Sequence, residues 1–430
     1  MDKDGEMALT ETRDVVVVGA GQAGLAASYC LTQLGQDHVV LEEHGIAHAW
    51  RDQRWNSFCL VTPNWTVQLP GAAYEGPKPD GFMTRDEIAT YLERYAASFE
   101  APVRSGLRVT SVKQTSRGTF RVEAGECVID ARAVVVAAGS YRRPKVPPVA
   151  SHLPAGLLQL HSSQYKNPGQ LPDGAVVVVG SGQSGVQIAE ELNESGRRVF
   201  LSVSGCPRVP FRYRGKQIMW WGKMGGLFDR TVDTLKSPAE KSACHPQASG
   251  THGGHDINLR QFATDGVTLL GRIQSADAGK LVVAPDLKEN LRKADEFAEA
   301  LLKQLDEAVA KMGMTLPEDT NPRGVGPEVP DETHPILELD LKEAGITSVV
   351  WATGYTQDFS FVHLPVFDAN GQPVQRQGVT NIPGLYFLGL EWLHKPKSGL
   401  LLGVGEDAAH ITSVIASEPE SESIHTEASS

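Results

Sequence analysis

Two nearly identical glycine-rich turns constrain this chain more than any other feature of its sequence. "VVVVGAGQAG" spans Val15 to Gly24, and "VVVVGSGQSG" spans Val176 to Gly185, 161 residues later. Each is a G-x-G-x-x-G pattern that directly follows four valines and precedes a segment with helical spacing. A buried strand, a tight glycine turn and a helix together indicate a dinucleotide-binding βα unit. The duplication therefore predicts two such units on one chain.

The three glycines of each turn have separate roles. The first permits the tight turn, the second leaves room for a pyrophosphate beside the backbone, and the third lets the helix lie close to the strand. The helix N-terminus then offers N–H groups and a positive dipole end to the phosphates. The side chain of Gln183 could face a nicotinamide or only cap the helix. The predicted dinucleotide-binding residues are Gly19, Gly21, Gln22, Ala23 and Gly24 in the first turn, and Gly180, Gly182, Gln183, Ser184 and Gly185 in the second.

The two units differ after the next strand. Glu42 stands 18 residues beyond Gly24, where a carboxylate can accept hydrogen bonds from the ribose hydroxyls of FAD or NAD. The second unit has Ser202, Ser204 and Arg208 there and no acid. Hydroxyls and a guanidinium would hold a 2′-phosphate that a carboxylate would repel. The second site is therefore predicted to take NADPH, which would reduce a flavin held at the first.

Short apolar runs recur along the chain and indicate strands buried on both faces of parallel sheets. Together with the intervening helical segments they predict the α/β class. The runs are Val15–Val18, Val39–Leu41, Val134–Ala138, Val176–Val179, Val199–Val203, Val349–Ala352 and Leu385–Leu388.

The expected organisation is a two-dinucleotide flavoprotein with two Rossmann-like domains. Residues 14–166 and 336–416 form the FAD domain, and residues 167–335 form the NADPH domain, which carries an insertion at about 206–335. Residues 1–13 and 417–430 lack apolar periodicity and are expected to be disordered. One long helix is expected at Asp286–Met312. Its apolar stripe either packs on the body of the protein or forms a homodimer contact. The stripe comprises Leu287, Leu291, Ala294, Phe297, Leu301, Leu305, Ala308 and Met312.

Charge and cysteine usage restrict the class of partner and the compartment. The formal net charge of −12 argues against nucleic acid or an anionic membrane as the main partner. The five cysteines are scattered without a C-x-x-C pair, which favours reduced thiols and argues against a disulfide reductase. No apolar run approaches the roughly 20 residues of a membrane span, and the acidic N-terminus is unlike a signal peptide. A cytoplasmic enzyme with a small-molecule substrate is expected.

Several further motifs resemble those of the class B flavin monooxygenases, the group that contains flavin-containing monooxygenases, the plant YUCCA enzymes and Baeyer–Villiger monooxygenases. His161 and Tyr165 in "LHSSQYKNP" match the later half of the family fingerprint, although its front half departs from the pattern. "VVAAGSY" and "WATGY" resemble the two linker motifs, and "PGLYFLGL" resembles the closing FAD segment. The stretch His48–Gly71 is similar to a bacterial subfamily usually encoded beside a nitrilase.

This resemblance implies FAD and NADPH as cofactors, with O₂ as co-substrate. It implies a flavin C4a-hydroperoxide that oxygenates a soft nucleophile of a small molecule, first an amine nitrogen and second a sulfur. The alternatives are Baeyer–Villiger oxidation of a ketone, which Tyr165 in place of a Trp disfavours, and a non-oxygenating flavoprotein or NADPH oxidase.

The resemblance also implies roles for single residues. Asn64 stands where relatives carry an amide beside the reactive flavin carbon, and it is the predicted catalytic residue; the alternative is a turn-forming Asn after Pro63. Arg51 and Arg54, next to Trp50 and Trp55, could hold the flavin phosphates or close over the cofactor; the alternative is an ordinary surface arrangement of Arg on aromatic rings. Of these, Trp50 and Arg51 are predicted to bind the cofactor. The remaining residues predicted to bind cofactor are Gly139, Thr353 and Gly354, from the two linker motifs.

Two stretches of the insertion invite competing interpretations. The aromatic segment Arg208–Phe228 is either the substrate-access region or a plain aromatic subcore. Cys244–Asp256 holds one Cys and three His, but this spacing fits no common zinc pattern, so no metal is predicted.

Overall fold

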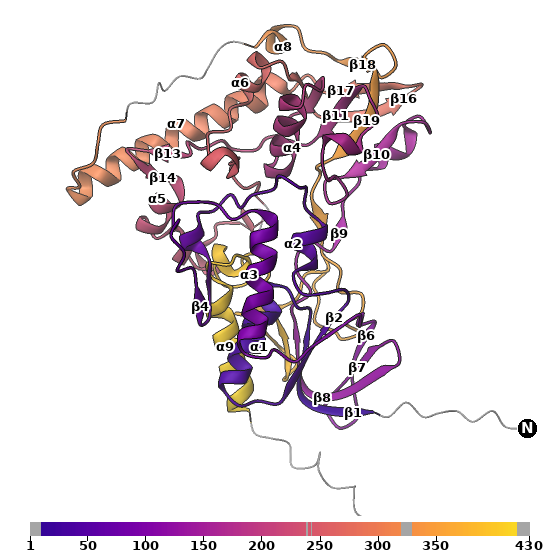
Figure 1. The fold of residues 1–430 in the computed structure, drawn as a ribbon, viewed down its shortest axis with the longest axis vertical. Helices are drawn as coiled ribbons and strands as arrows, with labels where there is room; N and C mark the ends of the chain where they lie inside the picture. Colours follow the sequence, from indigo (N-terminus) through magenta and orange to yellow (C-terminus); the bar gives the residue numbers. More distant parts are fainter. Residues whose placement is uncertain (1–9, 238–239, 242, 320–328, 419–430) are drawn as a thin grey trace, which may run out of the picture.

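The computed structural model describes residues 10–237, 240–241, 243–319 and 329–418. The chain forms two α/β units, one above the other in the vertical view, each built around its own sheet (Figure 1). The expected α/β class is therefore confirmed. The glycine turns lie at equivalent places, between β1 (Glu11–Val18) and α1 (Gln22–Gln33) and between β11 (Ala175–Val179) and α4 (Gln183–Glu194).

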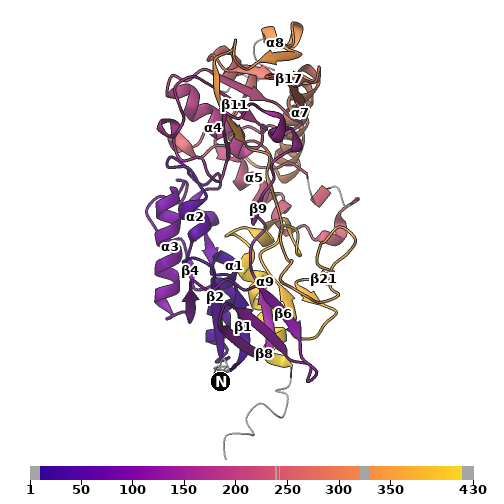
Figure 2. The same ribbon diagram turned by 90° about the vertical axis from the view of Figure 1, so that its right-hand side faces the viewer.

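The first sheet has the order β21-β22-β23-β8-β1-β2-β5, and the antiparallel pair β6 and β7 joins it through β8. Its four valines, Val15 to Val18, are fully or almost fully buried between layers. On one side, α1 packs against α9 (Val404–Ser417), so the last helix covers the first strand–helix unit (Figure 2). The strands beside β1 are β2 (His38–Glu42), β5 (Val103–Ser105), β6 (Ser111–Gln114), β7 (Phe120–Ala124), β8 (Cys127–Val136), β21 (Gln375–Arg376), β22 (Val379–Thr380) and β23 (Leu385–Phe387).

The second sheet has the order β10-β19-β11-β12-β15, and all of its pairs are parallel. A small antiparallel sheet of β16 (Ile273–Asp277), β17 (Lys280–Val283) and β18 (Glu338–Asp340) lies beside it. Besides β11, its strands are β10 (Leu158–His161), β12 (Val199–Ser202), β15 (Thr268–Leu270) and β19 (Ile346–Trp351). The other elements of the chain are α2 (His48–Asp52), β3 (Gln68–Leu69), β4 (Ala72–Ala73), α3 (Arg85–Ser98), β13 (Arg212–Tyr213), β14 (Lys216–Gln217), α5 (Ile218–Met224), α6 (Leu259–Thr264), α7 (Leu287–Met312) and α8 (Pro330–Thr333).

All seven predicted apolar runs form strands, but two of the predicted domain boundaries cut through the second sheet. β10 lies before residue 167 and β19 lies after residue 335, yet both pair inside the sheet that contains β11. Sheet membership therefore favours a second unit of about residues 158–351. The predicted disorder of residues 1–13 is wrong for its last part, because β1 already begins at Glu11. Residues 1–9 and 419–430 lie outside the described part of the chain.

The long helix is confirmed as α7, with Asp286 at its N-cap. Its buried face is rotated from the predicted stripe: Leu287, Leu291 and Ala294 are buried, whereas Phe297 and Met312 are 45% and 43% exposed. The helix therefore packs on the body through its N-terminal half and again through Val309 near its C-terminal end, and the homodimer contact stays untested.

Two connections join the units as a short antiparallel ribbon, β9 (Arg143–Pro144) with β20 (Tyr355–Thr356). Figure 2 shows β9 in the region between the two sheets. The buried His161 fixes this crossing, because its Nε2 donates to the carbonyl oxygen of Gly354 at 2.9 Å. Burial lowers the pKa of His161, which keeps the ring neutral. In the described part of the chain, no helix has the length and apolar character needed to cross a membrane.

Candidate active site between two glycine turns

A cavity of about 820 Å³ brings residues of both glycine turns together. The first turn contributes Gly19, Gly21, Gln22 and Ala23, and the second contributes Gly182, Gln183 and Ser184. The cavity continues along the first sheet to Glu42 and along the loop after β8 to Gly139. Two dinucleotides, one on each turn, would therefore share one cavity.

The first turn has the shape that a pyrophosphate requires. A side chain at Gly24 would collide with the carbonyl oxygen of Gly19, so only glycine lets α1 lie this close to β1. At Gly21, by contrast, no described atom lies within 4 Å of the place that a Cβ would occupy. That space faces the cavity and the N-terminus of α1, where the first N–H groups of a helix have no partner inside the helix. The turn therefore fits a dinucleotide.

Glu42 is fixed at the end of β2. One of its carboxylate oxygens accepts a hydrogen bond from the backbone N–H of Ala20 at 2.8 Å, and the other from that of His44 at 2.9 Å. A carboxylate has about four acceptor positions, so it keeps capacity for two ribose hydroxyls. Its place on the cavity wall agrees with its predicted role.

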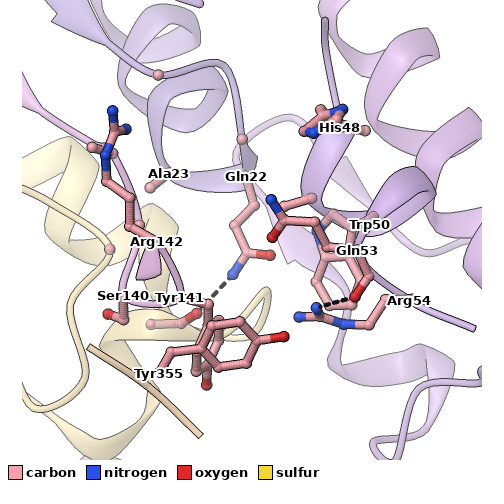
Figure 3. Close-up of a pocket in the computed structure, with 18 of the residues that line it drawn as sticks. Gln22, Ala23, His48, Trp50, Gln53, Arg54, Ser140, Tyr141, Arg142 and Tyr355 are labelled. Carbon is pink, nitrogen blue, oxygen red and sulfur yellow. Dashed lines mark hydrogen bonds between the residues drawn. The ribbon is translucent and has the colours of Figure 1, made fainter. Parts of the chain in front are cut away.

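An aromatic wall lies beyond the first turn, as Figure 3 shows. The guanidinium of Arg54 lies 5.5 Å from the Trp50 ring centroid and 5.9 Å from that of Tyr141. The Tyr141 and Tyr355 rings meet edge to face at 5.3 Å. Arg51 is not part of this wall, because its guanidinium turns to Glu93 on α3 at 2.5 Å. Of the two arginines considered for the cofactor, only Arg54 lines the cavity, and the predicted cofactor role of Arg51 stays without support.

The linker and closing motifs also reach the cavity. The side-chain amide of Gln22 donates to the carbonyl oxygen of Gly399 at 2.7 Å, which ties the first turn to the segment before α9 (Figure 3). Gly139 and Gly354 line the cavity. The hydroxyl of Thr353 instead donates to the carbonyl oxygen of Lys145 in the connecting ribbon. Thr353 therefore holds the crossing of the two connections and does not line the cavity.

The second turn repeats the geometry of the first, since a side chain at Gly185 would collide with the carbonyl oxygen of Gly180. Each of the three residues predicted to hold a 2′-phosphate already has a hydrogen-bond partner within the protein. The Ser202 hydroxyl is buried and donates to the carbonyl oxygen of Gly271 at 3.0 Å. The backbone N–H of Ser204 donates a hydrogen bond to the Ser181 hydroxyl at 2.9 Å. Nε of Arg208 donates to the carboxylate of Asp295 on α7 at 2.7 Å. None of the three predicted residues lines the cavity, so their role stays a prediction.

The predicted catalytic residue, Asn64, also stands outside the cavity wall. It is 5% exposed and begins a short 3₁₀ turn, Asn64–Thr66. Its amide nitrogen donates to the carbonyl oxygen of Lys78 at 2.9 Å, and its amide oxygen accepts from the N–H of Met83 at 2.8 Å. Both ends of the amide are therefore committed to the loop before α3. This geometry favours the alternative, a residue that holds a turn.

The cysteine prediction is wrong at one pair. Cys206 and Cys244 form a disulfide with their Cα atoms 5.5 Å apart, although 38 residues separate them in sequence. Such a spacing gives no sequence signal, because the pairing depends on how the insertion folds back. Cys244 lies on the cavity wall beside the second turn.

Sequence reasoning also missed a polar group on the far wall. One carboxylate oxygen of Glu391 accepts from the Tyr141 hydroxyl at 3.0 Å and lies 3.3 Å from Nε2 of His245. The hydrogen bond from His245 holds the pKa of the Glu391 carboxyl below its usual value, and the same bond raises the pKa of His245. The cavity therefore carries an ionised carboxylate at neutral pH. The three residues come from distant segments, so no local motif marks them.

The rest of the insertion contributes little to the cavity. Met219 lines it, while Tyr213 and Trp221 are buried together with Val309 of α7. The aromatic segment is therefore mainly a subcore. In the Cys/His loop, His252 pairs with Glu194 and His255 with Glu190. Among the described residues, no group of three or more His, Cys, Asp or Glu side chains is placed to hold a metal ion.

Two Rossmann-type turns on one cavity, with the first sheet completed by the C-terminal segment, define a two-dinucleotide flavoprotein. Comparisons with known proteins agree. Residues 16–213 match the family described as pyridine nucleotide-disulphide oxidoreductase. The chain is 34% identical to an uncharacterized oxidoreductase CzcO-like of Geobacillus kaustophilus, over 93% of this chain and 97% of the relative. It is 33% identical to indole-3-pyruvate monooxygenase YUCCA1 of Oryza sativa subsp. japonica, over 69% of this chain and 76% of the relative.

Solved structures show the same fold. A variant of the flavin monooxygenase of Stenotrophomonas maltophilia aligns with a TM-score of 0.64 at 20% identity, over 95% of this chain and 99% of that one. The chain belongs to the class B flavin-dependent monooxygenases, together with the CzcO-like oxidoreductases and the YUCCA enzymes. It is an oxidoreductase of this class, and its cofactors are FAD and NADPH.

The open space at Gly21 gives a sharp test of the first site. Gly21→Asp should fold normally, because no described atom blocks the new Cβ. Its carboxylate would repel the pyrophosphate, and we expect FAD affinity to fall about tenfold or more, equivalent to about 1.4 kcal/mol. Flavin absorbance per purified chain measures this. Gly156→Asp is the matched control, since its Cβ is equally free and the residue does not line the cavity. Full flavin content in Gly21→Asp would contradict the assignment.

The two hydrogen bonds of Asn64 predict a defect in stability. Asn64→Asp keeps the acceptor for Met83 but loses the donor to Lys78 and buries a charge. We expect the free energy of unfolding to fall by about 1–3 kcal/mol, measured by denaturant titration of the FAD-loaded enzyme. Unchanged stability, combined with release of hydrogen peroxide in place of product, would instead restore the catalytic prediction.

Proposed function

We propose that this enzyme uses NADPH and O₂ to transfer one oxygen atom to a soft nucleophile of a small molecule, first an amine nitrogen and second a sulfur. FAD would occupy the first turn and NADPH the second. The observation that carries the proposal is the shared cavity, which is lined by both glycine turns and by the ionised carboxylate of Glu391.

The residues present divide the work. Gly21, Glu42 and the N-terminus of α1 would bind the phosphates and ribose of FAD. When bound, FAD would accept the hydride of NADPH and activate O₂. Trp50, Tyr141 and Tyr355 would exclude water from the reacting end of the cavity.

Glu391 supports the choice of an amine. Its carboxylate is held by Tyr141 and His245 and faces the space that a substrate would enter. A fixed negative charge attracts a protonated amine, whereas a thioether or a ketone has no charge for it to recognise. Oxygen transfer then requires the neutral amine, so the bound amine must lose its proton before that step.

Three narrower assignments belong to the same proposal. Preference for NADPH over NADH would rest on Ser204 and on the free side of Arg208, since Ser202 is buried. The enzyme would work in the cytoplasm, where NADPH is available. The exposed Phe297 and Met312 of α7 would be the place to look for a homodimer contact.

Product analysis with isotopically labelled O₂ tests the reaction. We expect one labelled atom in the product of an amine, with NADPH consumed in about equal amount. The panel should include a thioether, a ketone and a 2-oxo acid, the last because the rice relative is named for indole-3-pyruvate. Label in an ester from the ketone would favour Baeyer–Villiger oxidation. NADPH oxidation that yields only hydrogen peroxide would favour the oxidase alternative.

Glu391→Gln tests the choice of substrate. It removes the charge and keeps an acceptor for Tyr141, so KM for an amine should rise about tenfold or more, as for loss of a charged hydrogen bond of about 1.5–3 kcal/mol. KM for a thioether should stay within about twofold, because a neutral substrate loses no charge pairing. Tyr141→Phe is the matched control: it removes the hydrogen bond and keeps the carboxylate. An equal rise for both substrates would mean that Glu391 only supports the wall.

A further inference from the structure

A short segment, residues 244–249, lies across the second glycine turn, and we call it the strap. It comes from the insertion, far from the turn in sequence. Three side-chain amides join the strap to the turn and its helix: Gln247 donates to the carbonyl oxygen of Ser181 at 2.7 Å, Gln183 to that of Pro246 at 3.1 Å, and Gln187 to that of Ala248 at 2.8 Å.

One covalent bond fastens the end of the strap. Cys244 is joined to Cys206, which follows β12 at the edge of the same turn. Cys206 is 5% exposed, whereas Cys244 is exposed on the cavity wall. Beside the disulfide, the N–H of Gln247 donates to the carbonyl oxygen of Pro207 at 2.9 Å. The strap and the end of β12 are therefore tied together next to the second turn.

The Cys206–Cys244 disulfide makes the two glycine turns differ at the second glycine of the pattern. At Gly21 no described atom lies within 4 Å of a built Cβ, but at the equivalent Gly182 the sulfur atoms of Cys206 and Cys244 both lie 4.0 Å away. The second glycine of the pattern is the one beside which a pyrophosphate must pass. In the second turn, the disulfide therefore borders the path of the pyrophosphate past Gly182, because a Cβ built there would be in van der Waals contact with both sulfur atoms.

We propose that Cys206 and Cys244 form a reversible thiol-oxidation site that controls the binding of NADPH at the second turn. In the disulfide form the strap narrows the pyrophosphate approach at Gly182. In the dithiol form the strap is held by the three amide hydrogen bonds, by backbone hydrogen bonds and by the contact of His245 with Glu391, all of which water can replace, and it can withdraw. The proposal rests on the assignment of NADPH to the second turn made above.

Small-molecule thiols can reduce the Cys206–Cys244 disulfide, and a peroxide can form it again. Two small-molecule thiols reduce the site: each gives up one hydrogen, the Cys206–Cys244 bond breaks to two thiols, and the small molecules leave as one disulfide. Hydrogen peroxide reverses this: the Cys244 thiolate attacks one peroxide oxygen to form a sulfenic acid, and the hydroxide that leaves takes up a proton to become water. The Cys206 thiol then attacks the Cys244 sulfur, the S–S bond closes, and the sulfenic oxygen leaves as a second water. The exposed Cys244 is the sulfur that either reagent can reach, and the buried Cys206 is placed to complete the exchange.

The test measures binding without turnover. NADP⁺ carries the same phosphates as NADPH but cannot reduce the flavin, so its Kd can be measured by calorimetry on the FAD-loaded enzyme. We expect the peroxide-oxidised enzyme to bind NADP⁺ at least about tenfold more weakly than the enzyme reduced with dithiothreitol. Cys244→Ser and Cys206→Ser should bind like the reduced enzyme under both conditions. Mass spectrometry after thiol alkylation reports the state of the pair.

Matched controls separate the outcomes. Cys127→Ser removes one of the unpaired thiols and should keep the full redox response. FAD content should stay constant throughout, since the first turn lies apart from the disulfide. Equal or tighter NADP⁺ binding by the oxidised enzyme would overturn the redox control. If reduction lowers the melting temperature but leaves the Kd of NADP⁺ unchanged, the disulfide only stabilises the fold, and the redox control is overturned as well. No NADP⁺ binding in either state or in the serine variants would instead overturn the NADPH assignment itself.

Discussion

The close contact between the third glycine of each turn and the carbonyl oxygen of the first is the constraint on which the rest of the structure depends. A single methyl group at Gly24 or Gly185 would collide with that oxygen. Because only hydrogen fits, each helix starts directly at the end of its strand and points its N-terminus into the cavity. A wider turn would aim the helix elsewhere, and neither dipole would face a phosphate. The catalytic space is therefore set by two backbone contacts.

A second constraint places the two turns opposite each other. The chain crosses between the units twice, and these crossings pair as β9 and β20. His161 and Thr353 hold that ribbon through carbonyl oxygens of Gly354 and Lys145. Tyr165, the other residue that matches the fingerprint motif, is fully buried, and its hydroxyl donates a hydrogen bond to the carboxylate of Glu191 on α4. His161 therefore supports the crossing between the units and Tyr165 supports the second unit, and neither side chain lines the cavity.

The sequence predicts best what depends on neighbouring residues. The seven strands, both glycine turns, the long helix and the place of Glu42 follow from local patterns, because a strand, a turn and a helix are specified within about 30 residues. Arg51 shows the limit: it and Arg54 are three residues apart in one motif, yet only the packing of α2 against α3 decides that Arg51 turns to Glu93 and Arg54 to the aromatic wall. The domain boundaries fail for a similar reason, since strand pairing in a parallel sheet is non-local.

Long-range placement also explains why two turns of almost the same sequence need not behave alike. The first is bordered by residues of its own unit and by the C-terminal segment, through Gln22 and Gly399, and its pyrophosphate approach is free. The second is bordered by a loop inserted after β12, whose cysteine pairs across 38 residues. A cofactor that remains bound requires a permanently shaped cradle, whereas one that delivers hydride and leaves must enter and exit in each cycle. On the proposed assignment, the permanent cradle would lie on the turn whose surroundings are complete without the insertion. The turn that must open and close would be the one that the insertion borders with a disulfide.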